Sequence, residues 1–146
     1  MGFEKKKRPF ARAYRNTPQT FADSTGAVVQ FDNQQYDTDD MFTPTDSKIY
    51  AKRLSGYYLV EGSVGFESAD AGWRIGYLRV NGSTYIAEAH AINEVDAGCV
   101  IILHCPWYFN VNDYVELYCG QHSGGNLNTF KGEFVTWMSL MHISGR

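Results

Sequence analysis

The segment FNVNDYVELYCGQHSGGNLN, Phe109–Asn128, contains the clearest structural pattern in the chain. After Asn112-Asp113, apolar and polar residues alternate strictly from Tyr114 to Cys119, and a glycine-containing turn, Ser123-Gly124-Gly125, follows. Successive side chains of a strand point to opposite faces, so one face would hold Val115, Leu117 and Cys119. The other face would meet water and hold Tyr114, Glu116 and Tyr118. The segment therefore predicts an antiparallel strand with one buried face.

The rest of the chain is typical of short strands separated by turns. Pairs such as Ser55-Gly56 and Asn81-Gly82 favour tight reversals. No stretch combines a 3.6-residue apolar period with helix caps. With 146 residues, 44% of them hydrophobic and 20% charged, the chain fits one globular domain. We expect an all-β sandwich or jelly roll with strands near residues 10–15, 28–31, 48–53, 57–67, 73–81, 85–93, 100–109, 114–121 and 133–143.

Three of these expected strands are apolar on both faces: Val100–Phe109, Phe134–Ile143 and the strand that begins at Tyr57. A sheet in a sandwich buries only its inner face, so a second apolar face must contact something else. Another copy of the same chain is the simplest partner. Burying about 800 Å² per copy at roughly 25 cal/mol per Å² would make such an assembly obligate or nearly so.

The first twenty residues form a basic arm, which includes the start of the first strand, and residues 21–146 form the expected jelly-roll domain. The arm has six basic residues and one acidic residue, whereas the rest of the chain has seven basic and fifteen acidic residues. This asymmetry favours electrostatic attachment, to nucleic acid or to an acidic protein surface, and we expect nucleic acid to be the less favoured partner. A solvated, frayed terminus is the alternative. The expected anchor residues are Lys5, Lys6, Lys7, Arg8, Phe10 and Arg12.

The arm lacks the apolar segment of a signal peptide, and no apolar run is long enough to span a membrane. We therefore expect synthesis and assembly in a cytoplasm, without membrane insertion.

No residue pattern points to a metal or a cofactor. Asp37, Asp39 and Asp40 group hard oxygen ligands, but D-T-D-D lacks the spacing of a calcium loop, so a solvated acidic turn is favoured over a cation site. The histidines lack metal-ligand spacing; they are His90, His104, His122 and His142. The cysteines are odd in number and contain no C-x-x-C pair, which predicts reduced, buried thiols at Cys99, Cys105 and Cys119.

Catalytic patterns are also missing. The chain has neither a G-x-S-x-G elbow nor a P-loop, and strand alternation alone explains Glu61, Glu67 and Glu88 as surface residues. We therefore expect a protein that is not an enzyme. Aromatic side chains suited to stacking on sugars or bases are Trp73, Tyr77, Tyr108, Tyr114 and Tyr118. Packing on an outer face, or at an interface, is the favoured interpretation of these aromatics.

Several ordered motifs together resemble one family. They are Phe31-Asp32 with Tyr36-Asp37-Thr38-Asp39, then Leu54-Ser55-Gly56-Tyr57-Tyr58-Leu59-Val60, Arg79-Val80-Asn81-Gly82, Asn112-Asp113-Tyr114-Val115-Glu116-Leu117 and Ser123-Gly124-Gly125. From about Ala11 to Ile143 the chain resembles the complement component 1q-like, tumour-necrosis-factor-like jelly-roll family. Its sequence motifs are most similar to those of the family's domains in tailed-bacteriophage virion proteins, that is, head-decoration, head-fibre or tail-fibre proteins. Two departures are Asn112, where the family has glycine, and Phe42-Thr43-Pro44, which lies further upstream than usual.

The resemblance implies a ten-stranded antiparallel jelly-roll sandwich that assembles as a homotrimer around a threefold axis. One sheet would then be buried between subunits, in agreement with the two-faced strands. We expect the subunit interface to contain Tyr58, Val60, Ile102, His104, Trp107, Phe109, Trp137, Met138 and Leu140.

Two functions fit this fold. The first is a structural virion component, a trimeric capsid decoration or cement protein or a short head fibre, attached through the arm. The alternative is the receptor-binding tip of a tail fibre or spike that recognises a host-surface glycan or protein. Because a tip needs a long shaft upstream, which twenty residues cannot supply, the structural role is favoured. The identity of the anchoring partner, the position in head or tail, and glycan binding stay open.

Overall fold

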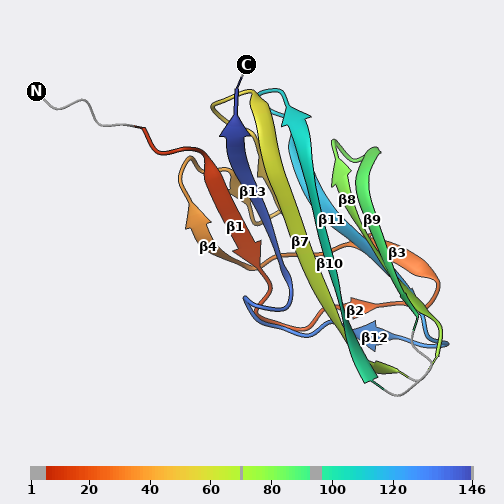
Figure 1. Ribbon diagram of the computed structural model, residues 1–146. Coiled ribbons are helices and arrows are strands. Elements are labelled where there is room, and N and C mark those ends of the chain that lie inside the picture. The colour runs from red at the N-terminus through yellow and green to blue at the C-terminus, as the bar shows by residue number, and fades with distance from the viewer. Residues whose placement is uncertain (1–5, 70, 93–96, 146) are drawn as a thin grey trace, which may run out of the picture.

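The computed structural model describes residues 6–69, 71–92 and 97–145, and in these ranges it contains thirteen strands and no helix (Figure 1). No helix that could cross a membrane is therefore present in those ranges. Most of the strands form two antiparallel sheets that pack against each other. The all-β sandwich expected from the sequence is confirmed.

The five-stranded sheet has the order β10-β7-β13-β1-β4. Its strands are β10 (Ala97–Phe109), β7 (Gly56–Ala69), β13 (Trp137–Ser144), β1 (Phe10–Tyr14) and β4 (Asn33–Asp37). The last strand, β13, lies between β7 and β1, and Phe10 of β1 pairs with Met141 of β13. The first and last strands of the chain are therefore neighbours, and β1 begins where β13 ends (Figure 1).

The six-stranded sheet has the order β5-β6-β11-β8-β9, with β3 paired to β11 outside this path. Its strands are β5 (Phe42–Thr43), β6 (Lys48–Tyr50), β11 (Tyr114–His122), β8 (Trp73–Val80), β9 (Thr84–Ile92) and β3 (Thr25–Val28). A short pair, β12 (Leu127–Asn128) and β2 (Thr20–Phe21), lies at one end of the sandwich (Figure 1).

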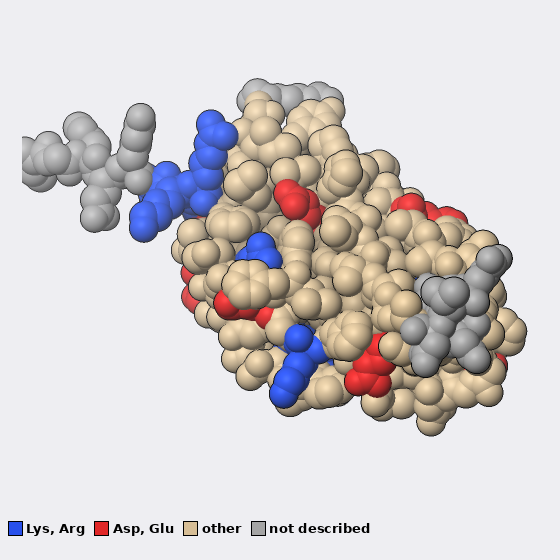
Figure 2. Space-filling view, turned by 60° about the horizontal axis from the view of Figure 1, so that its bottom comes forward, with Lys and Arg blue, Asp and Glu red and all other residues tan. Residues whose placement is uncertain are grey.

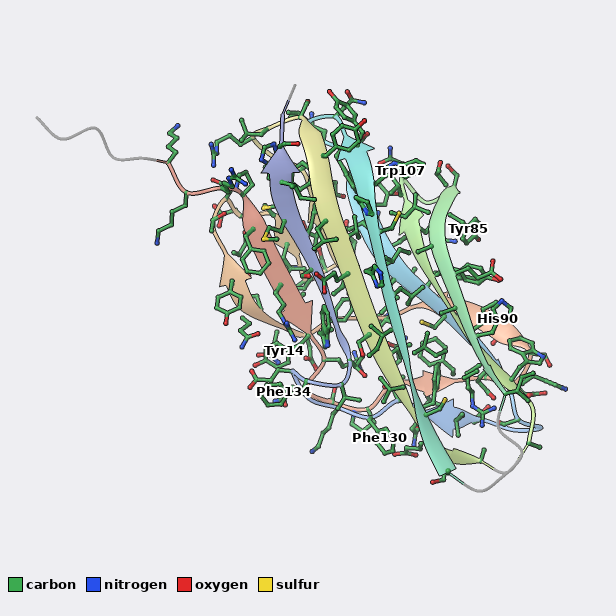
Figure 3. All side chains as sticks on the ribbon, viewed as in Figure 1. Tyr14, Tyr85, His90, Trp107, Phe130 and Phe134 are labelled. Atoms are coloured by element: carbon green, nitrogen blue, oxygen red, sulfur yellow. The ribbon has the colours of Figure 1, made fainter. Side chains whose placement is uncertain are left out.

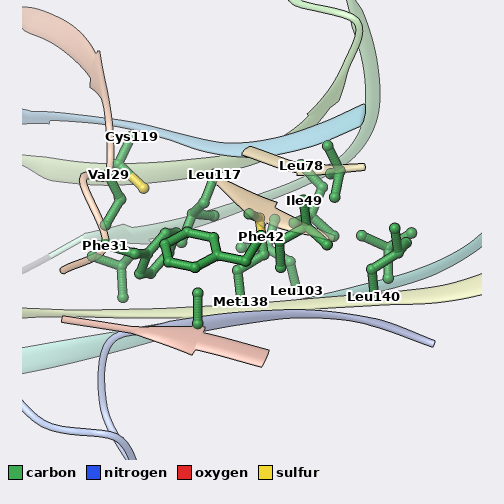
Figure 4. Close-up of a cluster of buried hydrophobic side chains, with 14 of the residues drawn as sticks. Val29, Phe31, Phe42, Ile49, Leu78, Leu103, Leu117, Cys119, Met138 and Leu140 are labelled. Atoms are coloured by element: carbon green, nitrogen blue, oxygen red, sulfur yellow. The ribbon is translucent and has the colours of Figure 1, made fainter. Parts of the chain in front are cut away.

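A single apolar core fills the space between the two sheets (Figure 4). Alternate residues of each strand enter it, because strand side chains change face at every residue. The five-stranded sheet contributes the fully buried side chains of Tyr58, Val60, Phe109, Met138 and Leu140. The six-stranded sheet contributes those of Ile49, Leu78, Val115, Leu117 and Cys119. Each such aliphatic side chain stabilises the fold by about 1.5–3 kcal/mol relative to exposure.

The alternation predicted for Tyr114–Cys119 is confirmed in β11. Val115, Leu117 and Cys119 are buried in the core, while Tyr114 and Tyr118 lie on the outward face. Glu116 also points outward yet is only 4% exposed, because Arg79 of β8 covers it. The Nε atom of Arg79 donates to Oε1 of Glu116 at 2.7 Å.

Two asparagines adopt the left-handed backbone that tight turns require. Asn112 has a φ of 77°, a left-handed conformation that asparagine tolerates better than most residues. Asn81 has a φ of 52° in the turn between β8 and β9. Its side chain joins two turns, since Oδ1 accepts from the Tyr114 amide at 3.0 Å and Nδ2 donates to Asp113 at 2.9 Å.

The strand count and the strand limits differ in part from those expected. The resemblance implies ten strands, whereas thirteen occur in the described residues; the short β2, β3 and β12 lie outside the two main strand orders. The strand expected near residues 10–15 is present as β1, which pairs with β13 on one side and β4 on the other. Strand β13 begins at Trp137 rather than near residue 133, because the amides of Val135 and Thr136 donate to Gly132 in a turn.

Candidate functional site

The outward face of the five-stranded sheet carries large apolar side chains on its three longest strands. On β10, Ile101 and Leu103 enter the core, whereas Ile102, between them in sequence, is 64% exposed. We call this surface the apolar sheet face and define it by five residues: Tyr57, Leu59, Val100, Ile102 and Met141. The core of one chain is complete without them, so the apolar sheet face marks a surface that favours contact with a partner.

A row of polar side chains crosses the middle of the apolar sheet face. His104 pairs with Glu61, Glu61 with Ser139, and Ser139 with Arg12, so the four residues follow one another across β10, β7, β13 and β1. Side chains directly opposite each other in a sheet lie within contact range. The Arg12 guanidinium lies 4.0 Å from the centre of the Trp137 ring and donates to the Glu133 carbonyl at 2.8 Å. A partner that covers this face must therefore accommodate a carboxylate and an imidazole near its centre.

Aromatic pairs stand at two edges of the same sheet. Tyr57 and Tyr108 face each other across β7 and β10 with ring centres 5.4 Å apart and planes at 82°. Phe10 and Tyr36 stack across β1 and β4 at 5.5 Å. Such contacts hold the rings in place, so less side-chain entropy is lost when a partner covers them.

The loop between β12 and β13 covers one end of the sheet (Figure 3). Phe130 and Val135 pack against Gly65 of β7, where an added Cβ would lie 2.4 Å from Val135 Cγ1. The hydroxyl of Ser63 donates to the Val135 carbonyl at 2.7 Å and fixes the loop to β7. Phe134 nevertheless projects from the loop with 81% of its surface exposed. The loop thus extends the exposed apolar surface beyond the strands.

The structure corrects more than half of the expected interface residues. Five of the nine have no exposed surface in a single chain and belong to its core: Tyr58, Val60, Phe109, Met138 and Leu140. A second copy cannot contact them unless the sandwich opens. Ile102, His104 and Trp137 lie on the outward side of the sheet. Trp107 is partly exposed, but it is an even number of residues from Leu103 and Phe109 in β10. It therefore lies on the same side of the sheet as they do, the side that faces the sandwich interior (Figure 3).

Part of the basic arm is docked on the body of the domain. Lys6 and Lys7 are exposed, and Lys5 lies outside the described residues. Arg8 donates to the Ile143 carbonyl at 2.8 Å. Of the other expected anchor residues, Phe10 and Arg12 lie in β1, where they contact Tyr36 and Trp137, so they belong to the sheet. Figure 2 shows blue side chains gathered beside the N-terminal residues, with only scattered charges over the rest of that face.

The acidic turn is held by its own carboxylates. Asp37 accepts hydrogen bonds from the amides of Met41 at 2.7 Å and Phe42 at 2.9 Å. Asp39 forms an ion pair with Arg53 at 3.2 Å, and Asp40 has a left-handed φ of 52°. Two of the three carboxylates thus have partners within the chain, and the part of the chain that the structure describes contains no cluster of potential metal ligands.

The cysteines are free thiols, and burial raises the pKa of Cys119, Cys99 and Cys105 above the ordinary value. Thiols with raised pKa values are weak nucleophiles at neutral pH. Three of the histidines have polar or aromatic neighbours: His90 contacts Glu88, His122 contacts Asp23 and Ser24, and His142 packs edge-on against Tyr58. At His122 the contacts come from a hydroxyl and a carboxylate, both at Nδ1 of the ring.

The remaining aromatic candidates divide between the two sheets. Tyr108 lies in the five-stranded sheet, whereas Trp73, Tyr77, Tyr114 and Tyr118 lie on the outward face of the six-stranded sheet. Trp73 and Tyr77 line a groove there together with two residues of β9 that the sequence analysis did not connect with them, His90 and Ile92. The signal was available in the alternation of β9, where Glu88, His90 and Ile92 share one face.

Similarity to known proteins is found at the level of structure. No protein-family model and no curated protein sequence matches the chain. Among solved structures, Eiger TNF from S. frugiperda superposes with a TM-score of 0.74 at 11% identity and covers 95% of this chain and 96% of that chain. The globular domain of zebrafish complement 1qA gives 0.70 at 15% identity, with 95% and 100% covered. Murine APRIL at pH 5.0 gives 0.74 at 9% identity, with 94% and 100% covered.

The chain has the jelly-roll fold of these TNF and complement 1q proteins. That part of the sequence-based resemblance is confirmed. At identities of 9–15% the likeness shows the fold alone.

Proposed function

We propose that this protein is a non-catalytic, homotrimeric structural component of a tailed-bacteriophage virion, and that its N-terminal arm attaches it to the particle. A capsid decoration or cement protein, or a short head fibre, is the specific role. The observation that carries the proposal is the apolar sheet face, because a surface of this kind favours assembly with further copies of the chain. The assignment to a virion is inferred from the sequence motifs, which resemble those of tailed-bacteriophage proteins.

Self-association explains both the apolar and the polar residues of the sheet face. Burial of Ile102 and Met141 against other copies removes exposed apolar surface from water. In the trimer that we propose, each Glu61 needs a partner, and His104 in the same row can supply it from its own or a neighbouring copy. Such polar rows favour one register of assembly over others.

Attachment through the arm follows from charge and position. Lys6 and Lys7 extend from the end of the sheet at which β1 begins, and their side chains are exposed. Three arms in one trimer would bind an acidic surface jointly, so a modest affinity per arm becomes a strong attachment. The body carries more acidic than basic residues, which leaves the arm as the basic part of the molecule.

The test separates assembly from attachment. Sedimentation velocity at micromolar concentration should show a trimer; a stable monomer that binds no hydrophobic dye would refute the assembly. Replacing Lys5, Lys6 and Lys7 by glutamine should leave the trimer intact and reduce the copies bound to particles that lack the protein. The control variant replaces Lys52 and Lys131, two exposed lysines of the body. Equal occupancy by all three proteins would exclude the arm as the anchor.

Salt gives a second measurement of the same contact. The loss of affinity caused by the arm substitutions should be larger at low salt, where charges act over about 30 Å at 0.01 M, than at physiological salt, where they are screened within about 8 Å. Imaging of intact particles then decides between the proposed role and the alternative. Copies distributed over the shell fit decoration, whereas copies at the end of the tail fit a receptor-binding tip.

A further inference from the structure

An open groove of about 480 Å³ lies on the outward face of the six-stranded sheet, lined by Trp73, Ile75, Tyr77, His90 and Ile92. Three of these residues alternate along β8, and the other two come from β9. The pairing places Trp73 opposite Ile92 and Ile75 opposite His90. The groove thus lies wholly on the surface of one chain, and its volume is in the range of small-molecule sites.

On the other side of β8, strand β11 has a glycine beside the groove. Gly120 pairs with Ile75 and has no side chain, so nothing rises beside the isoleucine at that position. Along the same strand, Tyr118 pairs with Tyr77 and His122 with Trp73. Tyr118 lies over Gly26 of β3, where a Cβ would come within 2.3 Å of its hydroxyl oxygen. The groove therefore has the aromatic rings of Trp73 and Tyr77 at its two ends and the apolar side chain of Ile75 between them.

Neighbouring residues hold both aromatic ends in place. The Tyr77 ring contacts Tyr85 edge-on at 4.9 Å, and burial raises the pKa of Tyr77. The Trp73 ring lies 5.9 Å from His122, which Ser24 contacts at 2.7 Å and Asp23 at 3.2 Å. Trp73 is still 39% exposed. Rigid, exposed rings bind a ligand with little loss of side-chain entropy.

The charges around the groove favour an uncharged ligand. None of the five lining residues is a lysine or an arginine. His90 is hydrogen-bonded to Glu88, and the nearby Arg79 is engaged in the ion pair with Glu116. A nucleic acid or an acidic glycan needs cationic contacts, which this surface lacks.

We propose that this groove binds a neutral oligosaccharide. The apolar C–H face of a sugar ring would lie against Trp73 or Tyr77, and its hydroxyl groups would hydrogen-bond to the His90–Glu88 pair, which offers both donors and acceptors. The site goes beyond the proposed structural function. Because it lies on the sheet opposite the apolar sheet face, its failure would leave the assembly and the arm untouched.

The experiment uses the full chain and defined probes. An array of neutral oligosaccharides (lactose, N-acetyllactosamine, maltotriose, cellobiose and chitobiose) is compared with sialyllactose and heparin fragments, and each neutral hit is titrated by tryptophan fluorescence and calorimetry. We expect binding of at least one neutral probe. Trp73→Ala should weaken it by about tenfold or more, which corresponds to about 1.4 kcal/mol, and Trp73→Phe should restore part of the affinity.

A matched control lies on the same sheet face. Tyr114→Ala removes an aromatic ring outside the groove and should leave sugar binding unchanged. Circular dichroism and sedimentation verify that all variants keep the wild-type fold and assembly. Absence of binding to every neutral probe at millimolar concentration would overturn the proposal. So would binding that persists in Trp73→Ala, or a preference for sialyllactose or heparin.

Discussion

Replacing Ile102 by aspartate separates assembly from folding. Ile102 is 64% exposed in a single chain, so the change should alter the free energy of unfolding of that chain by only about 0.5 kcal/mol. In an assembly the same position would bury an unpaired carboxylate, which costs about 3 kcal/mol per copy. Three copies then weaken a trimer by about 9 kcal/mol, or about a millionfold at 1.4 kcal/mol for each factor of ten.

The assay is sedimentation velocity over a range of concentrations, combined with thermal unfolding followed by circular dichroism. Ile92→Asp is the matched control, because Ile92 is 75% exposed but lies on the opposite sheet. We expect Ile92→Asp to remain a trimer and Ile102→Asp to sediment as a folded monomer. A trimer of normal stability from Ile102→Asp would refute the assignment of the apolar sheet face. Met138→Asp cannot serve this purpose, since Met138 is in the core and the charge would unfold the chain.

Three further predictions concern the body of the domain. Leu140→Ala should lower the free energy of unfolding in urea by about 3 kcal/mol because it leaves a cavity between the sheets, and a loss well below 1 kcal/mol would contradict its core position. Burial raises the pKa of Tyr58 to about 12, so between pH 10 and pH 12 the unfolded chain loses this proton first and stability falls as the pH rises. In Tyr58→Phe, the free energy of unfolding should fall by about 2–3 kcal/mol less between pH 10 and pH 12 than it does in the wild type. An equal fall in both proteins, measured by denaturation at alkaline pH, would disprove the contribution of Tyr58. Asp37→Ala should cost about 1–3 kcal/mol through lost hydrogen bonds to backbone amides, with a melting temperature that calcium does not change in either protein; a calcium-dependent shift would indicate a cation site.

The strands with one polar face were predictable from the sequence, because apolar and polar residues alternate wherever one face of a strand is exposed to solvent. Strand β11 is the best example, and its starting turn at Asn112 follows from local backbone preference. Strand β4, Asn33–Asp37, was missed because it is an edge strand with mostly polar, exposed residues and therefore shows no apolar period. Pairing with β1, a contact between distant segments, creates it.

The faces of the two-sided apolar strands were harder to assign. In Tyr57-Tyr58-Leu59-Val60 either parity can face the core, since both sets are apolar. Polar residues further along decide the question: Glu61 shares a face with Tyr57 and Leu59 and must avoid the core. The expected set on β10 also mixed His104 with Trp107, three residues apart, which strand geometry places on opposite faces. The groove was not foreseen, since it depends on the register between β8 and β9.

The central position of β13 has a consequence for biosynthesis. This strand is synthesised after the other described strands, yet it joins the β10-β7 pair to the β1-β4 pair. Before it arrives, the nascent chain contains two separate strand pairs with open edges at β7 and β1, which invite pairing with other chains. The domain therefore closes in one late step that connects distant parts of the chain, a topology that favours slow folding. A chain truncated before Trp137 lacks the strand that joins the two pairs, so we expect it not to form the closed sandwich.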